Sequence, residues 1–191
     1  MSNLNNNFFE RISNNPIIAA VNDLDKLDTA IRSPSEIIFL LTGNIINLKS
    51  IVDKVKASNM EIYVHIDLIE GFSRDGIVVE YISQYIKPNG IISTRSNLIN
   101  IAKKLDMFAI QRLFLLDYLS VDTGIKSLHS TKANAVELLP GIMPKVTEHI
   151  SKETNIPIIT GGLIKDKEDV ISSLKAGAIG ISTSKEEIWY M

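Results

Sequence analysis

The sequence contains no cysteine, and this absence excludes several kinds of protein. Without cysteine there is neither a disulfide framework nor a thiolate metal site. No apolar run reaches the ~18 residues that a membrane-spanning helix needs. The N-terminal residues also lack the basic region and apolar core of a signal peptide. We therefore expect a cytoplasmic protein without a membrane segment.

The sequence also lacks an excess of charge of either sign. Among 191 residues, 20 are Lys or Arg and 22 are Asp or Glu, so the formal net charge is −2. Electrostatic nucleic-acid binders usually carry a basic domain, which this balance does not indicate. The fingerprints G-x-G-x-x-G and G-x-x-x-x-G-K-[ST] of nucleotide-binding sheets do not occur, which leaves a doubly wound open sheet without support. At this length, 45% hydrophobic residues predict one globular domain.

What the sequence does contain is a regular alternation of short apolar runs and helical patterns. Most of the runs are continuously apolar, which is typical of parallel strands that are buried on both faces. The eight runs are residues 16–21, 36–41, 62–67, 90–93, 108–113, 135–138, 157–160 and 178–182. Eight strand–helix units predict a minimal (β/α)₈ TIM barrel, an α/β fold, at the lower end of its size range. We expect this single domain over residues 16–191, after a solvated lead-in over residues 1–15.

Glycines and hydroxyls follow the last two predicted strands. Gly161 and Gly162 end the seventh run, and Ser182, Thr183 and Ser184 end the eighth. In TIM barrels the loops after strands 7 and 8 form the usual phosphate site. Each motif also has a structural interpretation: the glycine pair suits a tight turn, and Ser184 with the glutamate three residues on suits a helix capping box. Because the two motifs occur together in adjacent units, we assign these five residues to a phosphate.

Ionisable side chains occur at three other predicted strand ends. His65 and Asp67 are two residues apart in the third run, so they are expected to share a face, and Glu70 follows. Arg112 lies in the fifth run and Glu137 in the sixth, where they form either a structural ion pair or a contact to an anionic ligand. The acidic residues suit a general base, a divalent metal or the hydroxyls of a ligand, and His65 alone is better explained by a buried polar network. We place all five at the barrel mouth and assign them to the polyol part of a ligand. We assign no residue to catalysis or to a metal.

Taken in order, these segments resemble a known family. They are Pro16-Ile17-Ile18-Ala19-Ala20-Val21, Phe39-Leu40-Leu41-Thr42-Gly43-Asn44-Ile45, His65-Ile66-Asp67-Leu68-Ile69-Glu70-Gly71, Gly90-Ile91-Ile92-Ser93-Thr94, Ile110-Gln111-Arg112-Leu113-Phe114, Glu137-Leu138-Leu139-Pro140-Gly141, Thr160-Gly161-Gly162-Leu163-Ile164 and Ser182-Thr183-Ser184. Their order and spacing resemble the glycerol-3-phosphate-responsive antiterminators, bacterial regulators of glycerol uptake operons. One departure is Thr160, where alanine is expected before the glycine pair.

The resemblance implies a TIM barrel that senses glycerol 3-phosphate and acts on leader mRNA, so that transcription reads through a terminator. It implies no enzymatic activity and no cofactor beyond the effector. The alternative is a small TIM-barrel enzyme, such as an isomerase, lyase or hydrolase, acting on a phosphorylated three-carbon metabolite. The lack of a clear nucleophile or strand-end lysine favours the regulator. The sequence leaves open the oligomeric state, a homo-oligomer included, as well as the RNA-binding surface and the effector selectivity.

Overall fold

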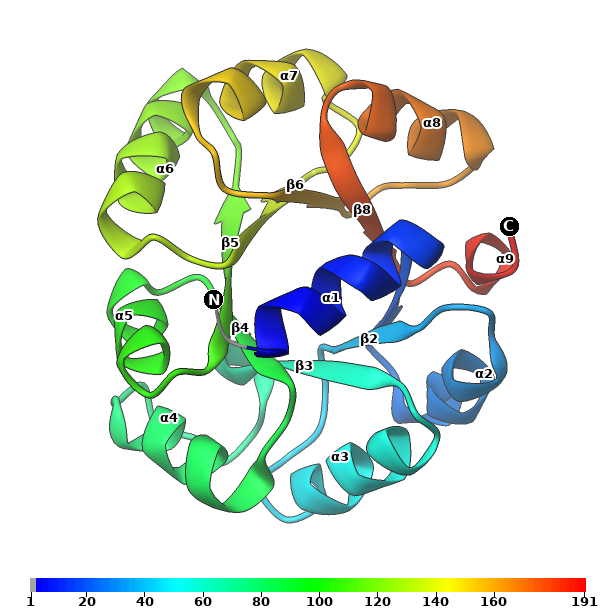
Figure 1. Cartoon of the computed structure of the whole chain (residues 1–191), viewed down its shortest axis with the longest axis vertical. Helices are drawn as coiled ribbons and strands as arrows, with labels where there is room; N and C mark the ends of the chain where they lie inside the picture. The colour runs from blue at the N-terminus through cyan, green and yellow to red at the C-terminus, as the bar shows by residue number, and fades with distance from the viewer. Residues whose placement is uncertain (1–2) are drawn as a thin grey trace.

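Eight parallel strands close a barrel in sequence order, β1 next to β8, in a computed structural model that describes residues 3–191 and their side chains from residue 7. The prediction of a single-domain (β/α)₈ TIM barrel is confirmed. Figure 1 shows the outer helices as a ring around the barrel. The strands are β1 (Ile17–Val21), β2 (Ile37–Leu40), β3 (Glu61–His65), β4 (Gly90–Ser93), β5 (Phe108–Phe114), β6 (Ala135–Leu139), β7 (Ile158–Gly161) and β8 (Ala178–Thr183).

The outer helices follow the apolar periodicity of the segments between strands. They are α2 (Leu27–Arg32), α3 (Leu48–Ala57), α4 (Ile77–Tyr81), α5 (Ser96–Lys104), α6 (Tyr118–Thr131), α7 (Pro144–Glu153), α8 (Lys167–Lys175) and α9 (Glu186–Trp189). Caps set some of the boundaries: the Asp166 carboxylate accepts from the amide of Asp169 at the start of α8, and Gly177 follows that helix with φ +100°. Short 3₁₀ turns precede α2 (Leu24–Lys26) and follow β3 (Ile66–Leu68), and a π-helical turn (Ile82–Ile86) extends α4.

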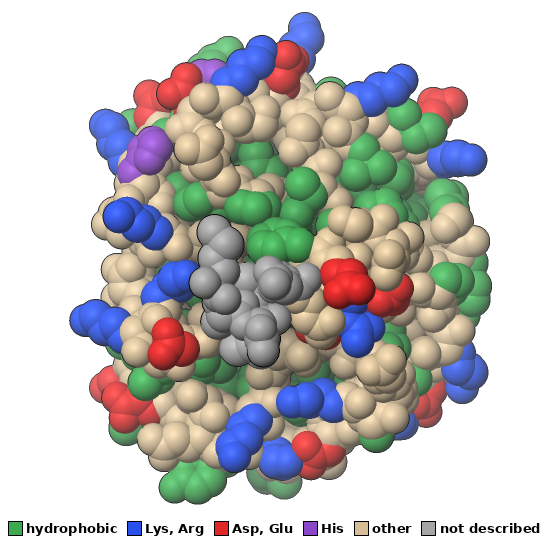
Figure 2. Space-filling model, in the orientation of Figure 1, with side chains coloured by type: hydrophobic (Ala, Val, Ile, Leu, Met, Phe, Trp, Pro, Cys, Tyr) green, Lys and Arg blue, Asp and Glu red, His purple; other side chains and the backbone are tan. Residues whose placement is uncertain are grey.

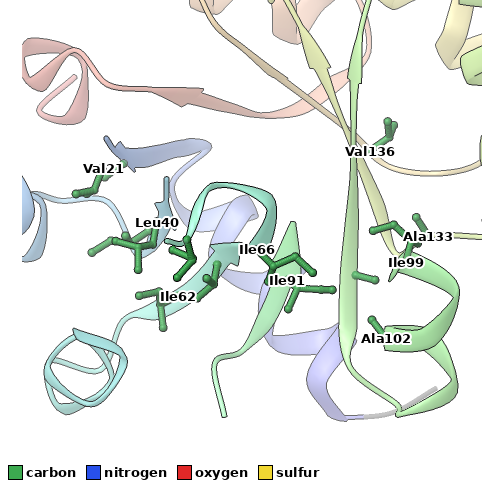
Figure 3. Packing of buried hydrophobic residues seen from close by; sticks show 14 of the residues in the cluster. Val21, Leu40, Ile62, Ile66, Ile91, Ile99, Ala102, Ala133 and Val136 are labelled. Atoms are coloured by element: carbon green, nitrogen blue, oxygen red, sulfur yellow. The ribbon is translucent and has the colours of Figure 1, made fainter. Parts of the chain in front are cut away.

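The main hydrophobic core lies between the strands and the outer helices. Figure 3 shows part of this layer, in which labelled side chains from strands meet those from α5 and neighbouring segments. The labelled residues are Val21, Leu40, Ile62, Ile66, Ile91, Ile99, Ala102, Ala133 and Val136, all nearly or fully buried. Burial of this layer is the principal contribution of the helices to stability, at roughly 25 cal/mol per Å² of apolar surface.

A further helix, α1 (Asn3–Asn14), crosses one end of the barrel (Figure 1). Its Phe8 and Ile12 are buried in a second apolar cluster inside the barrel, and the Phe8 ring lies 5.2 Å from that of Tyr63 and 4.7 Å from that of Phe108. The solvated lead-in expected over residues 1–15 is therefore, from Asn3 on, a helix that closes this end. Figure 2 views the same face, where many charged side chains lie at its edge, over the outer helices.

The barrel interior changes from apolar to polar toward the carboxyl ends of the strands. Tyr63, Ile110 and Ala135 belong to the interior cluster. Since side chains alternate along a strand, the residues two positions further, His65, Arg112 and Glu137, also point inward. The sequence thus places a polar layer at the end of the barrel that α1 leaves uncovered. Along residues 3–191, no helix has the length and apolar character needed to cross a membrane.

Candidate functional site

A cavity of about 390 Å³ opens at the carboxyl ends of the strands. Six of the ten residues predicted for the site line it: Arg112, Glu137, Gly162, Ser182, Thr183 and Ser184. They come from β5, β6, β8 and the loops after β7 and β8, so the fold brings together residues that are up to 72 positions apart (184 − 112). The volume is near the lower end of the range for small-molecule sites, which suits a small ligand.

The charges that line the cavity are mostly positive. Arg112, Lys165 and Lys185 provide three cations, and Glu137 provides one carboxylate. Arg112 Nε donates to Glu137 Oε2 at 2.6 Å, and both side chains are buried. Within the described part of the chain this is the one hydrogen bond of the Arg112 side chain, so its two terminal nitrogens remain for a ligand. The arrangement favours an anion, since an arginine fork suits carboxylate and phosphate oxygens.

Glu137 also organises the neighbouring strands β7 and β8. The Ser182 hydroxyl donates to Glu137 Oε1, and both groups are buried. A Cβ at Gly161 would overlap Ser182 Oγ and stand 2.8 Å from Glu137 Oε1, so glycine is required there by packing. Gly161 itself is not among the lining residues. Because a serine hydroxyl has a single proton, Ser182 in this arrangement cannot also donate to a phosphate.

The loop after β7 turns through two left-handed residues in succession, Gly162 at φ +74° and Leu163 at φ +62°. Leucine rarely adopts this conformation, which costs about 1–2 kcal/mol. Leu163 is largely exposed and lines the cavity. Strained backbone of this kind is concentrated at ligand sites.

The loop after β8 differs from the capping box that the sequence suggests. The N-cap position of α9 is Lys185, without a side-chain cap, and the Lys185 amide donates to Thr183 Oγ1 at 3.2 Å. Ser184 is therefore not the capping residue of α9, and its side chain lies in the cavity wall. Trp189, fully buried in α9, holds the end of β8 by donating from Nε1 to the Thr183 carbonyl at 2.7 Å.

The other acidic site residues lie beside the cavity and not in its lining. β3 ends at His65 and Asp67 lies in the 3₁₀ turn, so the expectation that the two share a strand face is wrong. The Asp67 carboxylate accepts from Ser93 Oγ, from the Thr94 amide at 2.7 Å and from Thr94 Oγ1. Glu70 is exposed, and its backbone pairs with the loop after β2.

His65 is a buried histidine held in its neutral form. Burial and, to a smaller extent, the positive charge of Arg112 lower its pKa from 6.5 to about 4, with Asp67 opposing both. His65 Nδ1 lies 3.9 Å from Asp67 Oδ2, too far for a hydrogen bond, and has no partner within the described residues. At neutral pH the two groups are therefore not an ion pair.

The described residues also contain no group of three or more His, Cys, Asp or Glu side chains that could hold a metal ion.

Sequence reasoning missed two cations of the site. Lys165 comes four residues after Gly161, and Lys185 comes two residues after Thr183, but neither is among the residues predicted for the site. Their position in the loops that directly follow β7 and β8 was the available signal. With these lysines, the site is a cavity with an excess of positive charge at the carboxyl end of a closed TIM barrel, lined by an arginine fork, hydroxyls and a glycine turn.

Comparison with known proteins assigns this barrel to a family. The family model of the glycerol-3-phosphate responsive antiterminators matches residues 17–189, and the chain belongs to this family. The glycerol uptake operon antiterminator regulatory protein of Listeria monocytogenes strain 4b F2365 is similar in structure, with a TM-score of 0.90 and 32% identity over 92% of this chain and 95% of that one. A glycerol uptake operon antiterminator-related protein of Thermotoga maritima has a TM-score of 0.82 and 30% identity over 92% and 98%. The Escherichia coli (strain K12) protein YgcP, described as uncharacterized, is 35% identical over 175 residues, 92% of each chain.

Proposed function

We propose that this protein is a glycerol-3-phosphate-responsive transcription antiterminator that regulates genes of glycerol uptake and metabolism through leader mRNA in the cytoplasm. The observation that supports the effector is the lining of the mouth cavity, in which three cations face a single carboxylate that Arg112 already neutralises. A dianionic phosphate balances the two remaining positive charges. Membership of the family supports the choice of glycerol 3-phosphate among small phosphates and the role of the leader mRNA.

In this proposal the phosphate lies between the loops after β7 and β8. Its donors are the backbone amides around Gly162, the hydroxyls of Thr183 and Ser184, and the two lysines. Gly161 and Ser182 act indirectly, because their packing holds Glu137 in place. Each hydrogen bond to a charged group contributes ~1.5–3 kcal/mol. Micromolar affinity corresponds to about −8 kcal/mol after the cost of association is subtracted, so it requires all of these donors together.

The hydroxyls of the glycerol moiety are assigned to the buried end of the cavity. Glu137 can accept from them, and the terminal nitrogens of Arg112 can donate to them or to a phosphate oxygen. His65, Asp67 and Glu70 are outside this lining, and we propose that they support the mouth from the side of β3. A neutral His65 next to Arg112 leaves the arginine charge available to the ligand.

Calorimetry with glycerol 3-phosphate, glycerol and inorganic phosphate tests the effector site. We expect binding of glycerol 3-phosphate, weaker binding of phosphate and none of glycerol at the same concentrations. Lys165→Ala and Lys185→Ala should each weaken binding about five- to tenfold, which is ~1 kcal/mol for an exposed charge. Lys167→Ala is the matched control, since this exposed lysine of the same loop region is not in the lining. Equal affinity for glycerol and glycerol 3-phosphate would refute the phosphate assignment.

A gel-shift experiment with the leader RNA of a glycerol uptake operon tests the proposed regulation through leader mRNA. We expect glycerol 3-phosphate to strengthen the shift, and the shift to weaken between about 50 and 200 mM salt, as phosphate-backbone contacts require. An unrelated RNA of the same length is the control. Effector binding without any effector-dependent shift would leave the ligand site in place and overturn the leader-mRNA role.

A further inference from the structure

An exposed apolar surface lies at the carboxyl end of β5 and the first turn of α6. Phe114, Leu116, Tyr118 and Leu119 are 53%, 85%, 89% and 73% exposed, although all four are large apolar or aromatic side chains. We call these four residues the β5–α6 face. Together they present on the order of 500 Å² of apolar surface, at the upper end of what a monomer exposes in one patch.

The β5–α6 face contains both protruding side chains and hollows. A hollow of about 160 Å³ lies between Leu116, Tyr118, Met143 and Val146, where the face meets the start of α7. A second hollow, of about 490 Å³, lies on the other side, where Phe114, Leu116 and Leu119 form an apolar wall and hydroxyl and amide side chains form most of the remainder. Leu116 therefore stands between two hollows. A surface that carries apolar protrusions beside an apolar hollow, here the one between α6 and α7, can be complementary to itself, which is what a two-fold interface requires.

The charges around these hollows restrict the kind of partner. Their lining residues carry one charge, that of Asp117. The Asp117 carboxylate is already engaged in the capping box of α6, where it accepts from the Ser120 amide at 2.7 Å. A nucleic acid needs cations for its phosphates, and this lining has none. A partner surface that is also apolar and nearly uncharged suits it instead.

We propose that a second copy of this chain docks on the β5–α6 face, across a two-fold axis that passes near Leu116. In such a dimer the protruding side chains of one copy enter the hollows of the other. The apolar area of each face is more than half of the ~800 Å² per partner of a standard interface, and the polar side chains around it supply the rest. This inference does not depend on the ligand or on the RNA.

Sedimentation velocity over a range of protein concentrations tests the proposal. The wild-type protein should form dimers at micromolar concentration, and Leu116→Lys with Leu119→Lys should give a monomer of unchanged circular dichroism. Ile46→Lys is the matched control: this side chain is 91% exposed but lies in the loop after β2, and its variant should remain dimeric. A wild-type protein that is monomeric at every concentration, or a double variant that still dimerises, would overturn the proposal.

Cysteine cross-linking locates the axis, because the chain has no cysteine of its own. Leu116→Cys should form an intermolecular disulfide under mild oxidation, seen as a dimer band on a non-reducing gel that reductant removes. Ile46→Cys should give a much weaker band at the same concentration. If both variants cross-link to the same extent, the two-fold axis does not pass through the β5–α6 face and the proposal fails.

Discussion

Acid should destabilise this protein through His65. The His65 side chain is 3% exposed, and burial together with the charge of Arg112 lowers its pKa from 6.5 to about 4, against the opposing effect of Asp67. The unfolded chain therefore binds more protons than the folded chain between these two values. The free energy of unfolding is unaffected by His65 above pH 6.5 and falls as the pH is lowered through this window.

The size of the loss follows from the two pKa values. Each pH unit between them is worth ~1.4 kcal/mol, so the full interval from 6.5 to about 4 corresponds to about 3 kcal/mol. Between pH 7 and pH 5, where only part of the interval is crossed, the loss is about 2 kcal/mol. That is a large fraction of the ~5–15 kcal/mol by which domains of ordinary size are stable.

Urea unfolding at several pH values, followed by circular dichroism, measures this loss. The comparison is between wild type and His65→Gln, which keeps a polar side chain of similar size but does not titrate. Groups that do not interact with His65 titrate alike in both proteins, so the wild type should lose about 2 kcal/mol more than the variant between pH 7 and pH 5. Equal losses in the two proteins would refute the reasoning, and so would a wild type that gains stability relative to the variant.

Three further substitutions test the packing of the barrel, each by urea unfolding. Gly161→Ala should lower the free energy of unfolding by ~1–3 kcal/mol and also weaken effector binding, because the added Cβ displaces Ser182 and Glu137. An unchanged affinity for the effector would show that this network does not shape the site. Phe8→Ala should cost ~3–5 kcal/mol, since Phe8 is fully buried at the closed end of the barrel; a loss below ~1 kcal/mol would mean that α1 is not part of the core. Leu163→Gly should gain up to ~1 kcal/mol by relieving the left-handed φ, whereas Leu163→Ala should not; equal effects would exclude backbone strain as the cause.

The fold could be predicted from the sequence because a parallel strand that is buried on both faces appears there as a continuously apolar run. All eight apolar runs contain or overlap strands of the barrel, and β5 differs from its run by one residue, ending at Phe114 instead of residue 113. Helix α1 could not be found in this way. Among its described side chains, from residue 7 on, Phe8 and Ile12 are the ones buried inside the barrel, and its asparagine-rich sequence suggested a solvated segment.

The site was predictable where it depends on strands and less so where it depends on loops. Arg112 and Glu137 pair across β5 and β6 in the register that neighbouring strands impose. His65 and Asp67 were expected on one face, but the chain leaves the strand between them, and spacing alone cannot show where a strand ends. Lys165 lines the cavity just after the left-handed turn at Gly162 and Leu163, a conformation that no periodicity reveals.

The charged residues of the mouth cavity lie at two depths in the barrel. At the buried level Arg112 and Glu137 neutralise one another, and Ser182 and Gly161 fix the carboxylate, so this level contributes shape and hydrogen-bond geometry more than net charge. At the rim, Lys165 and Lys185 are exposed, and their attraction for an anion is long-ranged but screened by salt. The buried pair is costly to alter because removal of one partner leaves a charge without compensation. If the proposed effector site is right, selectivity among small phosphates should therefore depend on the buried level, and the general preference for an anion on the rim.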